Sequence, residues 1–159
     1  MHEYCVLDRF DANILHELEC DGRISWVRLA ERVNLSPSAC QRRVESLRSN
    51  GVIERFTVRL NEAALGQGVK AFVAVRIDRQ DPAVAREFRH WVAAHPRVQT
   101  CHMVSGAEDF VLEVVARDLE SFGEFLDGEL LSLPAVKDAS SSIVLGQVKS
   151  RRTAVSPKR

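Results

Sequence analysis

Apolar residues recur at helical spacing through roughly the first fifty residues of the chain. They stand at relative positions 0, 3, 4 and 7 from Trp26 and at 0, 4 and 7 from Cys40, which places each set on one side of a helix. An earlier set follows Asp8 and ends before Asp21 and Gly22. The pattern predicts three short amphipathic helices around one small core. The predicted core residues are Leu7, Ile14, Leu15, Leu18, Trp26, Leu29, Ala30, Val33, Cys40, Val44 and Leu47.

Ser36 and Pro37 mark the beginning of the third helix, after a break at Asn34 and Leu35. A serine hydroxyl can accept a hydrogen bond from a free amide of the first turn, and proline fits the first helical position because no donor is needed there. Gly51 supplies the stop. A short amphipathic helix, a tight turn and a polar, arginine-bearing second helix are typical of the helix-turn-helix motif.

The outward face of this third helix is polar, with Arg42 opposite the apolar stripe and Gln41 on one shoulder. Arginine suits the edge of guanine and glutamine that of adenine, so we expect both to contact bases. Serines at the helix N-terminus are expected to bind phosphate, and the other arginines to position the backbone. The alternative is an ordinary helical hairpin with a solvated face. The predicted DNA contacts are Ser36, Ser38, Gln41, Arg42, Arg43, Arg48, Arg55 and Arg59.

Strand and helix patterns alternate in the second half of the chain. Segment 52–61 alternates apolar and polar residues and is predicted to be a strand, or a linker with strand character. The order β-α-β-β-α-β predicts a ferredoxin-like unit, and the chain as a whole an α+β fold. The predicted strands are 69–79, 98–104, 110–116 and 136–148. The predicted helices begin after Asp81 and Asp118, with inward Val84, Phe88, Trp91 and Val92 in the first and Leu119, Phe122, Phe125, Leu126 and Leu130 in the second.

The domain boundary is predicted at residues 61–68, where two glycines interrupt the pattern. The expected organisation is a helix-turn-helix domain over 1–60, the linker, a ferredoxin-like domain over 69–148 and a basic tail over 149–159. No stretch is apolar enough to cross a membrane or to form a signal peptide, so a cytoplasmic protein is expected. None of the four cysteines forms a CxxC pair, which indicates neither a disulfide framework nor a zinc site.

Charge is distributed unevenly along a chain whose net charge is zero. Residues 36–59 hold five arginines and two glutamates, a net +3, while residues 61–148 hold eight basic and thirteen acidic groups, a net −5. The tail 149–159 adds five basic groups and no acid. Positive charge is therefore concentrated where phosphate would be neutralised, although a basic tail can also be a merely solubilising end.

Catalysis and metal binding find little support in the residues. Cys101, His102 and Asp109 could suggest a thiol nucleophile and its base, but adjacent strand residues point to opposite faces. His90, His95 and His102 lack the spacing of metal ligands. An RNA-binding sheet would need aromatic residues on its central strands, and the stretch FVLEVVA has one. We therefore expect no enzyme, no metal and no cofactor.

The turn from Ser105 to Asp109 has the composition of a site for an amino acid. Backbone amides of a glycine-bearing turn can bind a carboxylate, and Asp109 could bind an ammonium group. A plain hairpin turn with solvated acids is the alternative that spacing alone favours.

The chain from Leu7 to Lys149 resembles the Lrp/AsnC (leucine-responsive/asparagine-regulator, feast/famine) family of transcription regulators. The resemblance lies in LDRFDANILHELECDGRIS from Leu7, LAERVNLSPSACQRRVESLRSNGVI from Leu29, CHMVSGAEDF from Cys101 and LLSLPAVKDASSSIVLGQVK from Leu130. It implies a DNA-binding regulator that forms dimers, often rings of four dimers, through its second domain. It also implies that small ligands, usually amino acids, bind between dimers beside the loop of residues 104–109.

Two positions depart from the family pattern, and both bear on the identity of the effector. Phe110 stands where tyrosine is common, and Ser142 stands where the leucine-responsive member has a bulky side chain. The main alternative function is an amino-acid-binding regulatory module of a metabolic enzyme system with no DNA role. The effector-binding residues implied by position, together with the turn, are Met103, Val104, Ser105, Gly106, Ala107, Asp109, Leu119, Leu131, Ser142, Ile143 and Val144.

Overall fold

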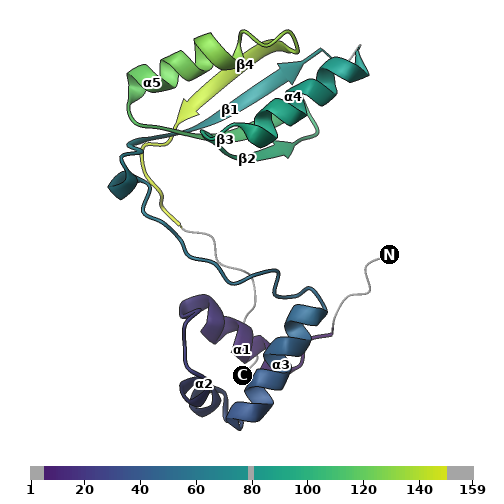
Figure 1. The fold of residues 1–159 in the computed structure, drawn as a ribbon, viewed down its shortest axis with the longest axis vertical. Helices are drawn as coiled ribbons and strands as arrows, with labels where there is room; N and C mark the ends of the chain where they lie inside the picture. The colour runs from purple at the N-terminus through teal and green to yellow at the C-terminus, as the bar shows by residue number, and fades with distance from the viewer. Residues whose placement is uncertain (1–5, 79–80, 150–159) are drawn as a thin grey trace. The chain divides into compact units, whose positions relative to one another are not determined.

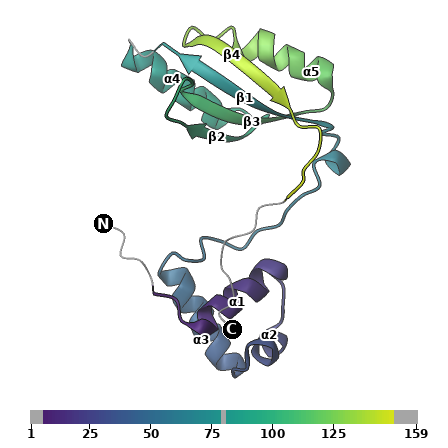
Figure 2. The same cartoon turned by 180° about the vertical axis from the view of Figure 1, so that it is seen from behind.

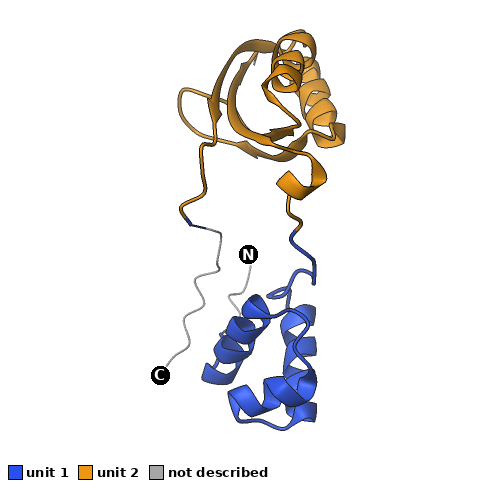
Figure 3. Cartoon of the chain, turned by 90° about the vertical axis from the view of Figure 1, so that its left-hand side faces the viewer, with its two compact units in different colours: residues 1–59, 149–159 blue, residues 60–148 orange. Residues whose placement is uncertain are grey.

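The computed structural model describes residues 6–78 and 81–149 (Figure 1). They divide into two compact units: an N-terminal unit that ends at Arg59 and a C-terminal unit, Leu60–Val148 (Figure 3). The predicted tail 149–159 lies outside the described residues except for Lys149. Each unit has its own apolar core and is described by itself. No helix among the described residues is long and apolar enough to cross a membrane.

The N-terminal unit consists of three helices: α1 (Arg9–Cys20), α2 (Trp26–Val33) and α3 (Pro37–Ser49). Local hydrogen bonds fix where each begins. The side chains of Asp8, Ser25 and Ser36 accept from amides in the first turn of the three helices, respectively. The turn between α2 and α3 passes through Asn34 in the left-handed conformation, with φ of 54°, which asparagine adopts more readily than most residues.

Residues from all three helices bury one another in the core of the N-terminal unit. The prediction for the third helix is confirmed, since Cys40, Val44 and Leu47 are all buried. The prediction for Trp26 is wrong, because this residue is 41% exposed. It lies at the first position of α2, and the core does not reach that end of the apolar stripe. The buried residues of this core are Ile14, Leu15, Leu29, Ala30, Val33, Cys40, Val44 and Leu47.

Segment 52–61 has strand-like alternation but belongs to no sheet in the described structure. Its apolar residues Phe56, Val58 and Leu60 are 50%, 73% and 63% exposed. A short 3-10 helix, η1 (Ala63–Leu65), follows within the predicted linker. The alternation therefore corresponds to an extended segment: Val52 and Ile53 at its start pack against the N-terminal core, whereas the later apolar side chains are largely exposed.

The C-terminal unit contains a four-stranded antiparallel sheet in the order β2-β3-β1-β4. Helices α4 and α5 lie on one side of this sheet (Figures 1 and 2). The predicted ferredoxin-like arrangement and the α+β class are confirmed. The elements are β1 (Val69–Ile77), α4 (Pro82–Ala94), β2 (Val98–Met103), β3 (Phe110–Ala116), α5 (Leu119–Gly123) and β4 (Val136–Ile143).

Two of the predicted elements of this unit differ from the structure. The helix after Asp118 changes at Glu124 from α5 into a π-helical segment, η2 (Glu124–Leu130), and Leu119 is 61% exposed rather than inward. Leu119 occupies the first position of α5. The last strand ends at Ile143, five residues earlier than predicted, because its pairing with β1 ends there.

The sheet has one covered face and one uncovered face. Along β1, residues Ala71, Val73 and Val75 are fully buried against the helices, whereas Phe72 is 45% exposed on the opposite face. The uncovered face also carries two ion pairs, Lys70 with Glu113 on β3 and Arg76 with Asp138 on β4, at 2.8 and 3.0 Å. Below, "the open face" means the surface formed by Lys70, Phe72, Ala74, Arg76, Val111, Glu113, Asp138, Ser140 and Ser142.

Candidate functional sites

The N-terminus of α3 presents two serine hydroxyls side by side. Ser36 Oγ accepts from the amide of Ala39 at 3.2 Å, and it lies 3.2 Å from Ser38 Oγ. Both serines are exposed. The first-turn amides of a helix attract anions, and hydroxyls beside them add donors. This end of α3 can therefore accept a phosphate group.

The outer face of α3 is formed by Arg42 and polar neighbours. Arg42 is exposed and lies opposite the buried stripe, as the spacing predicts. Gln41 and Arg48 instead line a groove of about 390 Å³ together with Trp26 and Phe56. The Arg48 guanidinium also pairs with Glu45 at 3.3 Å. Arg42 is thus exposed on the outer face of α3, and Gln41 lies on its flank.

Arg43 lies on the other shoulder of α3 and faces α1. Its Nη1 is 2.8 Å from Asp8 Oδ2 and 2.8 Å from Asp11 Oδ1. These partners direct the guanidinium toward α1. The sequence had instead predicted that Arg43 contacts the DNA backbone. The two remaining predicted backbone contacts, Arg55 and Arg59, lie on the exposed extended segment after α3.

The loop between β2 and β3 is the first group of predicted effector residues. Gly106 has φ of 137°, a conformation that side-chain-bearing residues rarely adopt. Ser105, Gly106 and Ala107 are exposed. Met103, 75% exposed, borders a groove of about 460 Å³ between α4 and β2. The loop therefore offers accessible backbone beside an apolar groove.

Asp109 is buried under this loop rather than exposed in it. It is 7% exposed, and its Oδ2 accepts from the amide of Ile77 at 2.9 Å. Its own amide donates to the carbonyl of Val75, and its carbonyl accepts from the amide of Val104. The carboxylate thus joins the loop to β1, at the place where the register of β1 and β4 shifts between Arg76 and Ile77. This geometry favours a structural role over the predicted contact with a ligand ammonium.

The second group of predicted effector residues lies at the opposite end of the sheet. The amide of Val144 donates to the carbonyl of Lys70 at the start of β1, whereas the loop is joined to Val75 near its end. Five residues of strand separate these points, about 17 Å at the usual rise per residue. One protomer therefore does not bring the two groups together. Ser142, Ile143 and Val144 belong to this second group. Leu119 lies at the same end of the sheet, because it follows Arg117 and Asp118 and the carbonyl of Arg117 accepts from the amide of Gly68.

The pair Cys101 and His102 does not form a nucleophile and its base. Cys101 pairs in register with Leu112 of the covered face, and His102 with Val111 of the open face. Burial raises the pKa of the Cys101 thiol, which disfavours the reactive thiolate. No group of three or more potential metal ligands occurs within residues 6–78 and 81–149.

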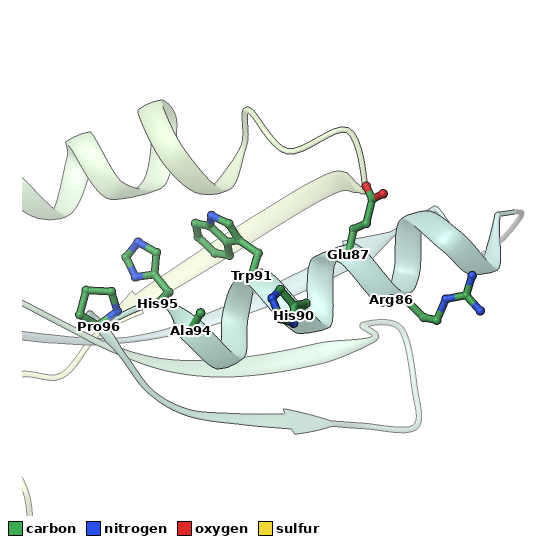
Figure 4. Close-up of a pocket in the computed structure, with 7 residues that line it drawn as sticks. All are labelled: Arg86, Glu87, His90, Trp91, Ala94, His95 and Pro96. Carbon is green, nitrogen blue, oxygen red and sulfur yellow. The ribbon is translucent and has the colours of Figure 1, made fainter.

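A depression on α4 was not anticipated from the sequence. It measures about 580 Å³ and is formed by α4 and the turn that follows it, with Trp91 and His95 along one side (Figure 4). His95 Nδ1 accepts from the amide of Arg97 at 3.2 Å, so Nε2 is the protonated nitrogen that faces Glu129 at 2.7 Å. The four-residue spacing of Trp91 and His95 was the available signal, but Trp91 was interpreted only as core and His95 was considered only as a metal ligand.

Known proteins match both units. Residues 7–48 match the AsnC-type helix-turn-helix domain, and residues 70–154 match the Lrp/AsnC ligand binding domain. The leucine-responsive regulatory protein of Escherichia coli strain K12 is 40% identical over 143 residues, which cover 90% of this chain and 87% of that protein. The protein of the same name from Klebsiella pneumoniae has the same identity and coverage.

Solved structures give the same result for the fold. A transcriptional regulator of Neisseria meningitidis in complex with L-methionine superposes with a TM-score of 0.88 at 35% identity, covering 96% of this chain and 97% of that one. The feast or famine regulatory protein of M. tuberculosis complexed with L-methionine gives 0.83 at 31% identity, covering 95% and 100%.

Proposed function

Since this chain belongs to the Lrp/AsnC family of transcriptional regulators, we propose that it binds operator DNA through α3 and that an amino acid bound to its C-terminal unit modulates this binding. The observation that carries the DNA-binding mode is the position of Arg42, exposed opposite the buried stripe of α3. A helix held by one face against a core presents its other face to the major groove. The net charge of +3 over residues 36–59 favours approach to phosphate.

The proposed DNA contacts follow from where the side chains lie. Arg42 contacts a base edge, and Gln41 reaches the adjacent base from its flank. Ser36 and Ser38 bind a phosphate at the N-terminus of α3, and Arg48, Arg55 and Arg59 position the DNA backbone. The basic tail adds affinity without sequence preference.

A single recognition helix contacts only one half-site and gives a low affinity for DNA. The binding unit is therefore proposed to be a two-fold dimer or a higher assembly of dimers. The open face supports this proposal. It has an apolar centre around Phe72 and Val111, with the two ion pairs toward its margins. An apolar centre with a polar rim is the usual anatomy of a protein interface. A cytoplasmic location is consistent with the DNA partner.

The effector is proposed to be an amino acid that binds between protomers. Two similar regulators were solved with L-methionine, and the loop here offers exposed backbone amides that suit a carboxylate. The predicted residues occupy opposite ends of one sheet, so a common site needs the loop of one protomer and the β4 end of another. Asp109 is then a positioning residue beneath the loop. An effector acts through its different affinity for two states of assembly or of DNA geometry.

The alternative is an amino-acid-binding module that regulates a metabolic enzyme and has no DNA role. One experiment separates it from the proposal. An operator is first selected by the wild-type protein from a pool of random duplexes, and wild type, Arg42→Ala and Arg86→Ala are then titrated with that operator and with random duplex. Arg86 is an exposed helical arginine of the C-terminal unit and serves as the matched control.

We expect Arg42→Ala to weaken operator binding by about 1–3 kcal/mol and to relax sequence preference, because a base contact is lost. Arg86→Ala should bind as wild type does. Equal losses in both variants, or none in Arg42→Ala, would remove Arg42 from the interface. If the wild type selects no sequence, the enzyme-regulatory alternative is favoured.

A further inference from the structure

Arg43 occupies a position on α3 that differs from that of its neighbour Arg42. Its side chain is 29% exposed, and its guanidinium is directed at the N-terminus of α1. At about 100° per residue, one step along α3 turns the side chain from the outer face toward the core edge. The two adjacent arginines therefore face different partners: one faces solvent, the other a neighbouring helix.

The partner of Arg43 is the capping box that begins α1. Asp8 Oδ1 accepts from the amide of Asp11 at 2.8 Å, and the Asp11 carboxylate accepts in return from the amide of Asp8. One nitrogen of Arg43 lies 2.8 Å from the remaining oxygen of Asp8 and 2.8 Å from Asp11 Oδ1. The guanidinium carbon also lies 5.4 Å from the ring centre of Phe10. Contacts with Asp8, Phe10 and Asp11 thus attach the middle of α3 to the N-terminal end of α1.

The geometry points to Arg43 as a positioning residue for DNA recognition: by tying α3 to the capping box of α1, it fixes the rotation of α3 and hence the direction in which Arg42 projects. This inference rests on the proposed function, since it assumes that α3 is the recognition helix. The buried stripe alone leaves α3 some freedom to roll, because apolar contacts are non-directional. A charged contact at one shoulder removes that freedom.

The same contacts make Arg43 a poor phosphate ligand. A phosphate that approached its guanidinium would meet two carboxylates already within hydrogen-bond distance, and like charges at such range repel. Arg43 would have to leave both partners to bind DNA, and Asp11, at 17% side-chain exposure, would lose its counter-charge. Binding and positioning therefore make opposite predictions about salt.

The test uses the full-length protein, with the operator selected as above and a random duplex of the same length. Operator and random-duplex affinities are measured at several salt concentrations for wild type, Arg43→Ala, Asp11→Asn and the double variant. Asn at position 11 keeps the size of the side chain and an acceptor oxygen but removes the charge. The ratio of the two affinities cancels general electrostatic effects. Circular dichroism at the assay temperature confirms that each variant is folded.

We expect the ratio to fall about tenfold in Arg43→Ala and by less in Asp11→Asn, because Asp8 still pairs with Arg43 in that variant. The double variant should fall no further than Arg43→Ala, because the Asp11 contact is already lost with Arg43. The salt slope of random-duplex binding should stay at the wild-type value in Arg43→Ala. Combined with Arg42→Ala, Asp11→Asn should lower the ratio less than it does alone, because the side chain whose direction it fixes is absent. Combined with the control Arg86→Ala, its effect should be unchanged. The proposal is overturned if Arg43→Ala lowers the salt slope by about one while the ratio holds, since that marks a lost phosphate contact. It is also overturned if Asp11→Asn lowers the ratio as much in Arg43→Ala as it does in the wild type. Loss of operator selection by the wild type itself would instead count against the proposed function.

Discussion

The two units of this chain bury their apolar side chains in different ways. The N-terminal unit encloses its core between three helices and turns polar side chains such as Arg42 outward. The C-terminal unit covers one face of its sheet with helices and leaves Phe72 on the other face 45% exposed. We propose that another molecule covers the centre of the open face around Phe72, so that the C-terminal unit mediates assembly while the N-terminal unit contacts DNA.

Charge divides the units in the same way. Residues 36–59 carry a net +3 and residues 61–148 a net −5. Only the first can attract the phosphate backbone, and the second tends to repel it. Acidic side chains in the C-terminal unit also form ion pairs with basic side chains, as Glu113 and Glu62 do with Lys70 at 2.8 Å each. The net negative charge of the C-terminal unit therefore disfavours its approach to phosphate, and part of that charge also stabilises the fold through ion pairs.

The largest effect is expected from Phe72→Lys, which tests the difference in apolar surface. Phe72 lies directly opposite Glu113 of β3 and Ser142 of β4, so a lysine there finds a carboxylate within the protomer but leaves a charge in the centre of the proposed interface. Loss of a central aromatic anchor typically costs about 2–4 kcal/mol, so the dimer dissociation constant should rise roughly 30-fold or more.

Val27→Lys is the matched control for Phe72→Lys. Val27 is 59% exposed on α2, in the unit whose core is already complete. Sedimentation equilibrium should show the control assembling as wild type does, while Phe72→Lys shifts toward monomer at the same concentration. Unchanged mass for Phe72→Lys, or equal dissociation of both variants, would refute the assignment of assembly to the open face.

A smaller effect is expected from Asp109→Ala, which tests how the C-terminal unit holds its effector loop. The change leaves the amide of Ile77 without its carboxylate partner in a buried place, and an unpaired buried donor costs about 1–3 kcal/mol. The midpoint of urea unfolding should fall accordingly. Glu108→Ala, one residue earlier, should change unfolding by no more than about 0.5 kcal/mol.

The same variant separates positioning from ligand contact at Asp109. Wild type is first screened against the twenty amino acids by thermal shift, and the responding amino acid is then titrated into Asp109→Ala. A positioning role predicts a lower starting melting temperature and a ligand-induced shift that persists at higher ligand concentration. A variant of wild-type stability that no longer responds would show that the carboxylate binds the ligand directly.

Features fixed by neighbours in sequence could be predicted from the chain, and features fixed by distant neighbours could not. The caps Ser36, Asp81 and Asp118 all hydrogen-bond amides within three residues, and each was identified from the sequence pattern. The roles of Arg43 and Asp109 depend on bonds to residues 32 positions away. No local pattern distinguishes such an arginine from a DNA contact, or such an aspartate from a ligand contact.

The exposure of Trp26 and Leu119 could not be predicted for a related reason. Both fit an apolar helical spacing, and both occupy the first position of their helix. Periodicity says which residues share a side, but the length of the core decides how far along the helix that side is covered. The family resemblance also assigned residues at opposite ends of the sheet to one effector site. A match by position in the sequence carries no information on which protomer supplies each residue.

The smallest effect is expected at the cap of α5, and it concerns the acid sensitivity of the C-terminal unit. The amide and side chain of Ser121 and the guanidinium of Arg117 lower the pKa of Asp118 to about 2, from an ordinary value of 3.8, with the Ser121 amide as the largest cause. A carboxyl whose pKa is lower in the folded state stabilises that state fully above pH 3.8. This contribution is lost as the pH falls from 3.8 toward 2.

Asp118→Asn keeps a capping oxygen but removes the charge, so the variant should be less stable than wild type at pH 6 and nearly equal to it at pH 2. Each unit contains one tryptophan, so a Trp26→Phe background lets Trp91 fluorescence report unfolding of the C-terminal unit alone. Asp127→Asn, an exposed carboxylate of η2, serves as control and should follow wild type at both pH values. A gap between Asp118→Asn and wild type that stays constant down to pH 2 would mean that the charge of Asp118 does not stabilise the cap.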